Sequence, residues 1–390
     1  MKLVERHIVK GDEFYDLCVK AKNLYNQSLY YWRQSIFGNI EYFSEYELTK
    51  VFAEFNEENF RALPAQTSQQ IIKNLFENIK GWQKSRKEYN KNPFKFLGKP
   101  KLPKYKKETS VVYFTNQQII LRDGYIHFPK AVNLNPIKTK VDHINQVRVV
   151  PNSDHFTVEV VYSRQEKPLK EYNGKWMGID LGLNNLATVV SESSAYIFNG
   201  KPLKAINTFY NERKAKLQSQ LPKNKFLSTK INRLTNNRNR KIGDKIHKIS
   251  RKIINIAKNE NITKIIVGNN RGWKQNINIG AINNRNFTYI PHSVLLEKIR
   301  YKGLMEGIEV VETQEAYTSK CSALDLESIK KHESYLGRRI KRGLFSTKSG
   351  FKINADINGA LNIARLVAGD EIISNLVRSV VLTPKVINVF

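Results

Sequence analysis

WMGIDLGLNNLATVV, residues 176–190, contains the feature on which the fold assignment depends, an aspartate inside an otherwise apolar strand. A carboxylate among apolar neighbours is strongly destabilising unless a cation or hydrogen-bond donors compensate for its charge. A metal ion bound to Asp180 would provide that compensation. The alternative is structural, with the Asp180 carboxylate accepting backbone N–H groups of the Gly-Leu-Asn-Asn turn that follows.

Strands and helices alternate along the chain after this stretch. Isoleucines recur at helical spacing within residues 223–258, and an apolar strand, KIIVG, follows at 264–268. A helix over 290–308, the strand EVVET at 309–313 and a last helix over 354–369 complete the order. In an RNase H-like α/β fold with this order, acids at strand ends and on the last helix converge. We therefore expect an RNase H-like domain over residues 166–390.

The amino-terminal half shows a different pattern. VERHIVK, residues 4–10, is typical of a strand, and apolar residues from Phe14 to Trp32 then recur at steps of three and four. β-Branched and aromatic runs between 110 and 162, with Asp123-Gly124 at a turn, predict antiparallel strands. We expect a small antiparallel β-barrel or sandwich over residues 1–165, with a helical insertion at about 11–92.

The charge balance points to a polyanionic partner. The 390 residues include 65 Lys and Arg against 35 Asp and Glu, a net charge of +30. Only two cysteines occur, and there is neither a secretion signal nor an apolar run long enough to span a bilayer. The sequence thus predicts a nucleic-acid-binding protein of a reducing cytosol, without membrane contact.

The last helix supplies a second acid, Asp356, in the segment NADINGALNI. A carboxylate in the first turn of a helix is favoured by the helix dipole in any case, so capping is the structural alternative. Asn354, Asn358 and Asn362 repeat at four-residue steps beside apolar positions. We expect this amide ladder to form one wall of an active site.

Several segments together resemble one protein family. MGIDLGLNNLATV resembles the first motif of the RuvC-type nuclease domain of transposon-encoded TnpB proteins, the ancestors of type V CRISPR effectors. AYTSKCS and DINGALNIAR resemble the neighbourhood of its third motif. LPAQTSQQIIKNL and GKPKLPKYK resemble the amino-terminal half of the same family. The resemblance spans nearly the whole chain, in the family's order.

The resemblance implies an RNA-guided DNA endonuclease. Its guide RNA would come from the transposon end, and it would cut double-stranded DNA beside a short target-adjacent motif. Two divalent ions about 4 Å apart, held by two aspartates and a glutamate, would hydrolyse the phosphodiester. Oxygen ligands suit Mg²⁺, with Mn²⁺ as a possible substitute. Asp180 matches the first acid of the family and Asp356 the third.

The family's usual glutamate is missing at the end of the strand 264–268, where this chain has Gly268. Glycine has no side-chain oxygen, so a metal ligand must come from elsewhere or the nuclease is inactive. Glu315 follows the next strand at the same end of the sheet, and adjacent strands lie only about 4.8 Å apart. We predict Glu315 as the relocated acid and Glu312, expected on the opposite face, as the second candidate.

The family's zinc-binding cysteine pairs are also missing. Cys321 is present, but Leu324 stands where its partner would be, and Cys321 with His332 cannot provide four ligands. We therefore expect no zinc, a degenerate insertion at about 318–352, and an inert buried Cys321. The insertion is strongly basic and is expected to fold over the substrate strand near the catalytic acids.

Contacts to phosphates that do not depend on base sequence are expected from four basic zones, residues 84–107, 223–258, 271–274 and 330–342. Aromatic residues within them, such as Phe94, Tyr105 and Trp273, are candidates for stacking on bases, and burial of Trp273 in the core is the alternative. The predicted nucleic-acid-binding residues are Lys84, Arg86, Lys87, Lys101, Lys104, Arg233, Arg238, Arg240, Lys241, Lys245, Trp273, Lys274, Arg338, Arg339 and Arg342.

Two other functions fit the same sequence. The first is an RNA-guided DNA-binding protein that has lost cleavage and represses transcription by occupying its site. The second is a DDE-type transposase, which shares the RNase H-like fold and acts on its own transposon ends without a guide. The last acid of such a transposase is usually a glutamate, whereas this chain has Asp356.

Overall fold

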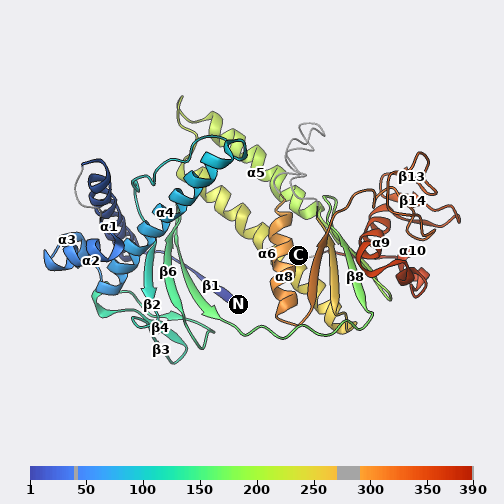
Figure 1. Ribbon diagram of the computed structural model, residues 1–390, viewed down its shortest axis with the longest axis horizontal. Coiled ribbons are helices and arrows are strands. Elements are labelled where there is room, and N and C mark those ends of the chain that lie inside the picture. Colours follow the sequence, from blue (N-terminus) through green and yellow to red (C-terminus); the bar gives the residue numbers. More distant parts are fainter. Residues whose placement is uncertain (39–42, 270–289, 389–390) are drawn as a thin grey trace. The chain divides into compact units, whose positions relative to one another are not determined.

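A computed structural model describes residues 1–38, 43–269 and 290–388, which form two compact units, Met1–Arg164 and Gln165–Phe390. Figure 1 labels their helices and strands. Trp273 and Lys274, two of the predicted nucleic-acid contacts, lie outside the described residues. No described helix combines the length and the apolar character needed to cross a membrane.

The first unit packs a group of helices against an antiparallel sheet. The predicted strand at the amino terminus, β1, pairs along its whole length with β7, and the sheet order is β1-β7-β6-β2. Apolar side chains of α1 and α4 share one core with β2, β6 and β7. Its elements are β1 (Lys2–Val9), α1 (Asp12–Phe37), α2 (Glu45–Glu54), α3 (Glu58–Arg61), α4 (Ala65–Lys91), η1 (Pro93–Lys95), β2 (Val112–Thr115), β3 (Ile120–Arg122), β4 (Tyr125–His127), η2 (Lys130–Val132), β5 (Ile137–Lys138), β6 (Gln146–Pro151) and β7 (Phe156–Ser163).

The expected barrel is not closed in the described part of this unit. β1 and β2 form the two edges of the four-stranded sheet, and β3, β4 and β5 form a separate small sheet. Closing a barrel requires strands long enough to tilt and stagger around a common axis. β3, β4 and β5 contain only two or three residues each, so they form a small appendage.

The second unit is built on a six-stranded sheet of order β12-β11-β8-β9-β10-β16. β8, β9 and β10 form an antiparallel meander, and β11 and β12 run parallel to β8 on its other side. This is the strand arrangement of the RNase H-like fold. The elements are β8 (Trp176–Asp180), β9 (Asn185–Ser191), β10 (Ala195–Asn199), α5 (Lys201–Ser219), α6 (Thr229–Asn259), β11 (Lys264–Gly268), α8 (His292–Leu304), β12 (Glu309–Thr313), β13 (Arg338–Lys341), β14 (Leu344–Ser346), β15 (Lys352–Asn354), α9 (Ala355–Ala368), η3 (Asp370–Ile373), α10 (Arg378–Leu382) and β16 (Lys385–Ile387).

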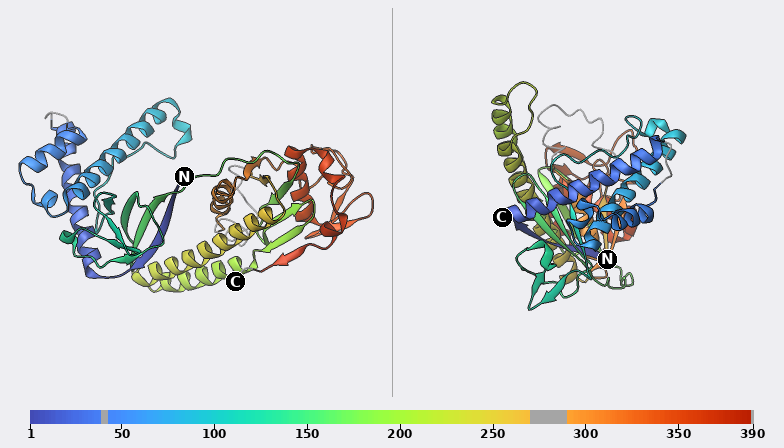
Figure 2. Two further views of the ribbon diagram at one scale, coloured as in Figure 1. Left: turned by 90° about the horizontal axis from the view of Figure 1, so that it is seen from below. Right: turned by 90° about the vertical axis from the view of Figure 1, so that its left-hand side faces the viewer.

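Helices cover both faces of this sheet. The isoleucine stripe of α6, predicted from its spacing, packs together with α8 on one face. α9 packs on the other face, so that the sheet lies between α8 and α9 in Figure 1. α5 and α6 run side by side as a long hairpin, which Figure 2 shows from another direction. β8 at the centre is therefore covered on both sides, and its carboxyl end meets the start of α9.

Candidate active site

Asp180 is the last residue of β8, and α9 passes directly over its carboxylate. A Cβ atom added at Gly359 would lie 2.8 Å from Oδ2 of Asp180, closer than such atoms approach in folded proteins. Glycine at this position therefore lets the helix lie against the acid. The same approach brings the first turn of α9, with Asp356, to the end of β8.

Asp356 is oriented by three neighbours. Its backbone N–H donates to Oδ1 of Asn354, the N-cap residue of α9, over 2.8 Å. Nδ2 of Asn185, at the start of β9, donates to Asp356 Oδ2 over 2.7 Å. A guanidinium nitrogen of Arg339 lies 3.6 Å from Asp356 Oδ1. The sequence did not identify Asn185, although its place in the turn after the first acid was a signal.

Glu315 lies beyond the end of β12, in the segment that leads to α9, and its side chain reaches back to β11. A Cβ atom added at Gly268 would lie 2.6 Å from Cγ of Glu315, and the Glu315 carboxylate would be closer still. The Glu315 side chain thus occupies the volume that a side chain at position 268 would need. A carboxylate from the segment after β12 therefore lies beside the end of β11, where the sequence has no acid.

Glu312 is engaged elsewhere. Nδ2 of Asn269 donates to Glu312 Oε2 over 2.7 Å, and Arg300 of α8 forms an ion pair with the same carboxylate. Since α8 covers the face of the sheet opposite to α9, these contacts hold Glu312 away from Asp180. The two glutamates thus have different partners, as predicted, although β12 ends at Thr313 and strand alternation does not extend to Glu315.

The three acids are electrostatically coupled. Burial raises the pKa of Asp180 well above its usual value, and the negative charges of Asp356 and Glu315 raise this pKa further, while Arg339 opposes the shift. Burial also raises the pKa of Glu315 to about 7. The positive charge of Arg339 only partly offsets the negative charge of the cluster, and carboxylate oxygens are the ligands that Mg²⁺ prefers. The donor set fits a divalent cation.

This cluster is not a ready-made metal cage. In the part of the chain that the structure describes, no three His, Cys, Asp or Glu side chains are arranged to hold a metal ion as they stand. Asn185 and Arg339 already contact both oxygens of Asp356. A cation bound by all three acids would therefore compete with these two contacts for the carboxylate of Asp356.

The raised pKa of Glu315 predicts how the stability of the metal-free protein depends on pH. A carboxyl group whose pKa is higher in the folded state stabilises the fold at low pH, and this contribution is lost as the pH rises through about 7. We expect thermal denaturation to show a loss of about 2–3 kcal/mol between pH 5 and pH 8, smaller in Glu315→Gln. The matched control Glu333→Gln alters an exposed acid and should keep the wild-type slope. An unchanged slope in Glu315→Gln would contradict the assignment.

The insertion between β12 and α9 is organised by hydrogen bonds. Cys321 is buried, and its Sγ donates to the Ser328 carbonyl over 3.4 Å. Burial raises the pKa of Cys321, as expected for an unreactive thiol. Asp325 closes the insertion by accepting from the Ser322 hydroxyl and from the backbone N–H of Lys348. This carboxylate joins the two ends of the loop.

The insertion also carries the basic hairpin β13–β14. Arg339 on β13 is the residue that lies 3.6 Å from Asp356, whereas Arg338 and Arg342 are exposed. The sequence-based expectation that this basic segment folds near the acids thus applies to one of its three arginines.

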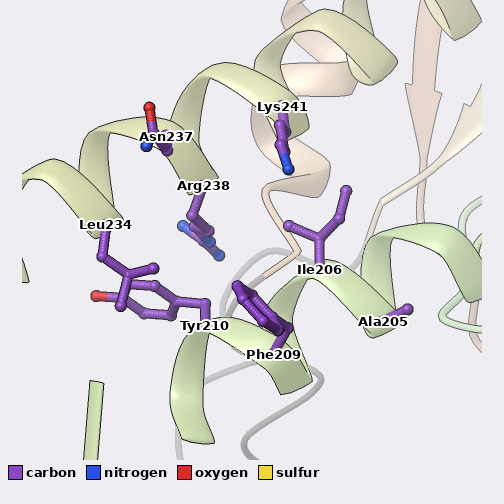
Figure 3. Close-up of a pocket in the computed structure, with 8 residues that line it drawn as sticks. All are labelled: Ala205, Ile206, Phe209, Tyr210, Leu234, Asn237, Arg238 and Lys241. Carbon is purple, nitrogen blue, oxygen red and sulfur yellow. The ribbon is translucent and has the colours of Figure 1, made fainter. Parts of the chain in front are cut away.

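Five of the predicted phosphate contacts lie on α6, and two of these five border a pocket. Arg238 and Lys241 of α6 face α5 across a cavity of about 360 Å³, which Figure 3 shows. Nε of Arg238 donates to Asn207 over 2.9 Å, and its guanidinium lies 5.6 Å from the ring centre of Tyr210. The other lining residues are Ala205, Ile206, Phe209, Tyr210, Leu234 and Asn237. Arg233 and Arg240 are exposed on the same helix, with Lys245 half-buried.

The predicted contacts of the first unit lie on α4 and in the extended segment that follows it. Lys84, Arg86 and Lys87 are on α4, and Lys101 and Lys104 are in the extended segment. Two aromatic residues of this region differ in their surroundings. Phe94 is fully exposed, whereas the ring of Tyr105 lies 4.7 Å from the guanidinium of Arg33. Phe94 is therefore the better candidate for stacking on a base.

Comparisons with known proteins identify two regions of the chain. Residues 156–274 match the OrfB_IS605 family, described as probable transposase. Residues 292–363 match the Cas12f1-like TNB domain. The TnpB-like protein ORF457 of Acidianus two-tailed virus is 23% identical over 257 residues, which are 63% of this chain and 50% of that protein. The chain thus spans about half the length of this relative.

Two solved structures show a distant likeness. The cryo-EM structure of the Cas12f1–sgRNA–target DNA complex is 18% identical, with a TM-score of 0.39 and coverage of 93% of this chain and 98% of that chain. The CRISPR-Cas12f ternary complex is 16% identical, also with a TM-score of 0.39, and coverage is 90% of this chain and 81% of that chain.

The fold and the site define an RNase H-like protein with an acidic cluster at the end of its first central strand. The matches to the transposase and TNB families and to a TnpB-like protein support a protein of the TnpB family.

Proposed function

We propose that this protein is an RNA-guided DNA endonuclease of the TnpB type, in which Asp180, Glu315 and Asp356 bind the catalytic metal ions. The observation that carries the proposal is the side chain of Glu315, which lies against Gly268 and adds its charge to that of Asp180. A half-buried carboxylate beside a second acid is unfavourable unless a cation or hydrogen-bond donors compensate for its charge, and a metal ion would do so here. The site therefore retains three acids in a changed arrangement.

The chemistry proposed for the site is hydrolysis of a DNA phosphodiester. Two Mg²⁺ ions, or Mn²⁺ in their place, would activate water and stabilise the departing oxygen. Asp180 lies deepest and depends most on a cation, because its ionised form is disfavoured by burial and by two neighbouring acids. Arg339 is partly exposed and lies at the Asp356 side of the cluster, where its guanidinium would meet a phosphate oxygen of the bound strand.

The proposed partners are a guide RNA from the transposon end and a double-stranded target DNA with a short target-adjacent motif. The support is the net charge of +30, the cationic faces of α4 and α6, and membership of the TnpB family. A guided nuclease holds RNA and heteroduplex mainly through phosphates, which distributed Lys and Arg side chains contact without reading sequence. The test is to purify the protein with its RNA, to sequence that RNA, and to offer matched DNA with Mg²⁺.

The α6 surface provides a specific prediction. The double variant Arg233→Glu/Lys241→Glu reverses two exposed charges and is expected to weaken RNA binding by about 10–100-fold at moderate salt. The slope of log affinity against log salt concentration should also decrease in magnitude by about two, because about two phosphate contacts are lost. Filter binding over a salt series measures both effects.

The control for this variant is Lys130→Glu/Lys138→Glu in the first unit, which changes the net charge equally at two other exposed lysines. Its RNA affinity should fall much less. Equal losses in the two doubles would mean that only net charge matters and that α6 is not a contact surface.

A nuclease-inactive, RNA-guided DNA-binding protein is the second candidate. It is favoured by the contacts that Asn185 and Arg339 make to Asp356, because these occupy both carboxylate oxygens. Guide-dependent binding without cleavage, at any concentration of Mg²⁺ or Mn²⁺, would select this function. Cleavage that requires all three acids would select the nuclease.

A further inference from the structure

Besides Asp356, α9 contains two buried asparagines. Asn358 and Asn362, two and six residues further along, are fully buried, although asparagine is mostly found at the surface. Their side chains do not line an open wall, as the amide ladder in the sequence had suggested. They contact the backbone of residues 318–323, the segment that follows Glu315.

Four hydrogen bonds join the two amides to this segment. Nδ2 of Asn362 donates to the carbonyl oxygens of Thr318, over 2.8 Å, and of Cys321, over 2.7 Å. Nδ2 of Asn358 also donates to the Cys321 carbonyl, over 2.8 Å, and its Oδ1 accepts the backbone N–H of Ala323 over 3.0 Å. A buried amide left without partners is costly, so the segment cannot shift along α9 without losing several bonds together.

The segment passes this restraint to Glu315. The Thr318 hydroxyl donates to the Glu315 carbonyl over 2.9 Å, and the Thr318 N–H donates to the same oxygen over 3.3 Å. Tyr317, between them, has a φ of 63°, in the left-handed region that bulky residues rarely adopt. Such a conformation persists where the surroundings impose it. The turn that carries Glu315 is thus held in one shape.

The position of Glu315 is therefore determined by the turn that follows β12. β12 ends at Thr313, so no strand pairing restrains Glu315, whereas Asp180 is the last residue of a central strand. We propose that Asn358 and Asn362 are positioning residues that hold the Glu315 turn at a fixed distance from Asp356. One helix would then place two of the three acids. This inference rests on the proposed nuclease function and adds to it the means by which the relocated acid is aligned.

The same network reaches the basic hairpin. Nη1 of Arg365 donates to Oδ1 of Asn362, over 2.8 Å, and to the Glu327 carbonyl, over 3.0 Å. The Glu327 carboxylate accepts the backbone N–H of Ser322 and of Leu336, two residues before β13. Hydrogen bonds from α9 thus organise an insertion whose sequence lacks the four ligands of a zinc site.

Hydrogen exchange is the first test. In Asn362→Ala, amides of residues 317–323 are expected to exchange at least about tenfold faster than in the wild type. Thr318→Val removes only the hydroxyl that bonds Glu315 and keeps the buried shape, so it should loosen the turn without unfolding the unit. Val367→Ala, on an exposed part of α9, is the control and should leave the turn unchanged.

The second test is the response to metal. Asn362→Ala and Thr318→Val are expected to raise the Mg²⁺ concentration for half-maximal cleavage by about tenfold, with guide-dependent DNA binding unchanged. Binding of Mn²⁺ to the guide-loaded protein, followed by the signal of the free ion in electron paramagnetic resonance, should weaken in the same proportion. A general loss of stability would instead lower DNA binding as well.

The outcomes separate this inference from the proposed function. A wild type that cuts, with variants whose exchange and metal response equal those of Val367→Ala, would overturn the positioning role and leave the nuclease intact. A wild type that does not cut would overturn the nuclease. The Mn²⁺ affinity of the variants would then test the positioning role. Weaker Mn²⁺ binding by Asn362→Ala and Thr318→Val than by the wild type would support this role, and affinities equal to that of the wild type would overturn it.

Discussion

Glu315→Gln is expected to lower the rate of DNA cleavage at least about a thousandfold, which corresponds to about 4 kcal/mol of transition-state stabilisation. Glutamine keeps the volume that lies against Gly268 and removes only the charge that a divalent ion would require. Guide-dependent DNA binding should remain, because Glu315 lies at the acid cluster and not on the basic surfaces. Single-turnover cleavage with excess protein, beside a binding assay in Ca²⁺, measures the two quantities separately.

Glu312→Gln is the matched control, since Glu312 lies only three residues away and bonds Asn269 and Arg300 instead. Its cleavage should stay within about tenfold of the wild type. Asp180→Asn and Asp356→Asn should be as inactive as Glu315→Gln. Loss of cleavage in Glu312→Gln with retention in Glu315→Gln would transfer the role to Glu312.

Moving the carboxylate back to β11 should restore part of the activity. Gly268→Glu alone is expected to abolish cleavage and to destabilise the second unit, because its Cβ would lie 2.6 Å from Cγ of Glu315 and 2.6 Å from Cδ1 of Ile363. Glu315→Ala removes the first obstacle, and the end of the Ile363 side chain can rotate away. We expect the double variant Gly268→Glu/Glu315→Ala to cleave at least about thirtyfold faster than Glu315→Ala, a gain of about 2 kcal/mol.

The control for the exchange is Gly268→Gln/Glu315→Ala, which has the same volume at position 268 and no charge. It should remain as slow as Glu315→Ala. If the carboxylate at position 268 restored no more cleavage than the amide, position 268 would not face the metal site. The shared volume of residues 268 and 315 would then be a matter of packing alone.

The elements of the second unit were largely predictable because each depends on local periodicity. The isoleucine spacing of α6, the apolar run of β11 and the apolar start at β8 are confirmed within the described residues. The arrangement of the strands in the amino-terminal unit was harder to predict. The strand predicted at residues 4–10 is confirmed as part of β1, which pairs with β7, whereas the expected closure of a barrel is not found among the described strands. Closure depends on the lengths and tilts of several strands together, which no single stretch of sequence specifies.

Some residues of the candidate site could likewise be predicted from the sequence, whereas others required the tertiary structure. A charged residue within an apolar strand and an acid at a helix start single out Asp180 and Asp356 from the sequence, because burial of a charge must be compensated wherever the strand lies. The choice between Glu312 and Glu315 needed the tertiary structure, since both follow the same strand and differ only in the partners that other elements bring to them. The buried amides of α9 were visible as a repeat, and their backbone partners across 35 to 44 residues of sequence were not.

Composition and periodicity by themselves thus predicted a basic protein with an RNase H-like order of elements and two acids at defined ends of them, and the motifs added a resemblance to TnpB proteins. Only the three-dimensional packing decided that Glu315 fills the space left by Gly268 and that α9 holds the turn beneath it. The reason is physical: periodicity reports which side of an element is buried. The position of a side chain on a loop depends on hydrogen bonds from residues that are distant in sequence and are brought together only by folding.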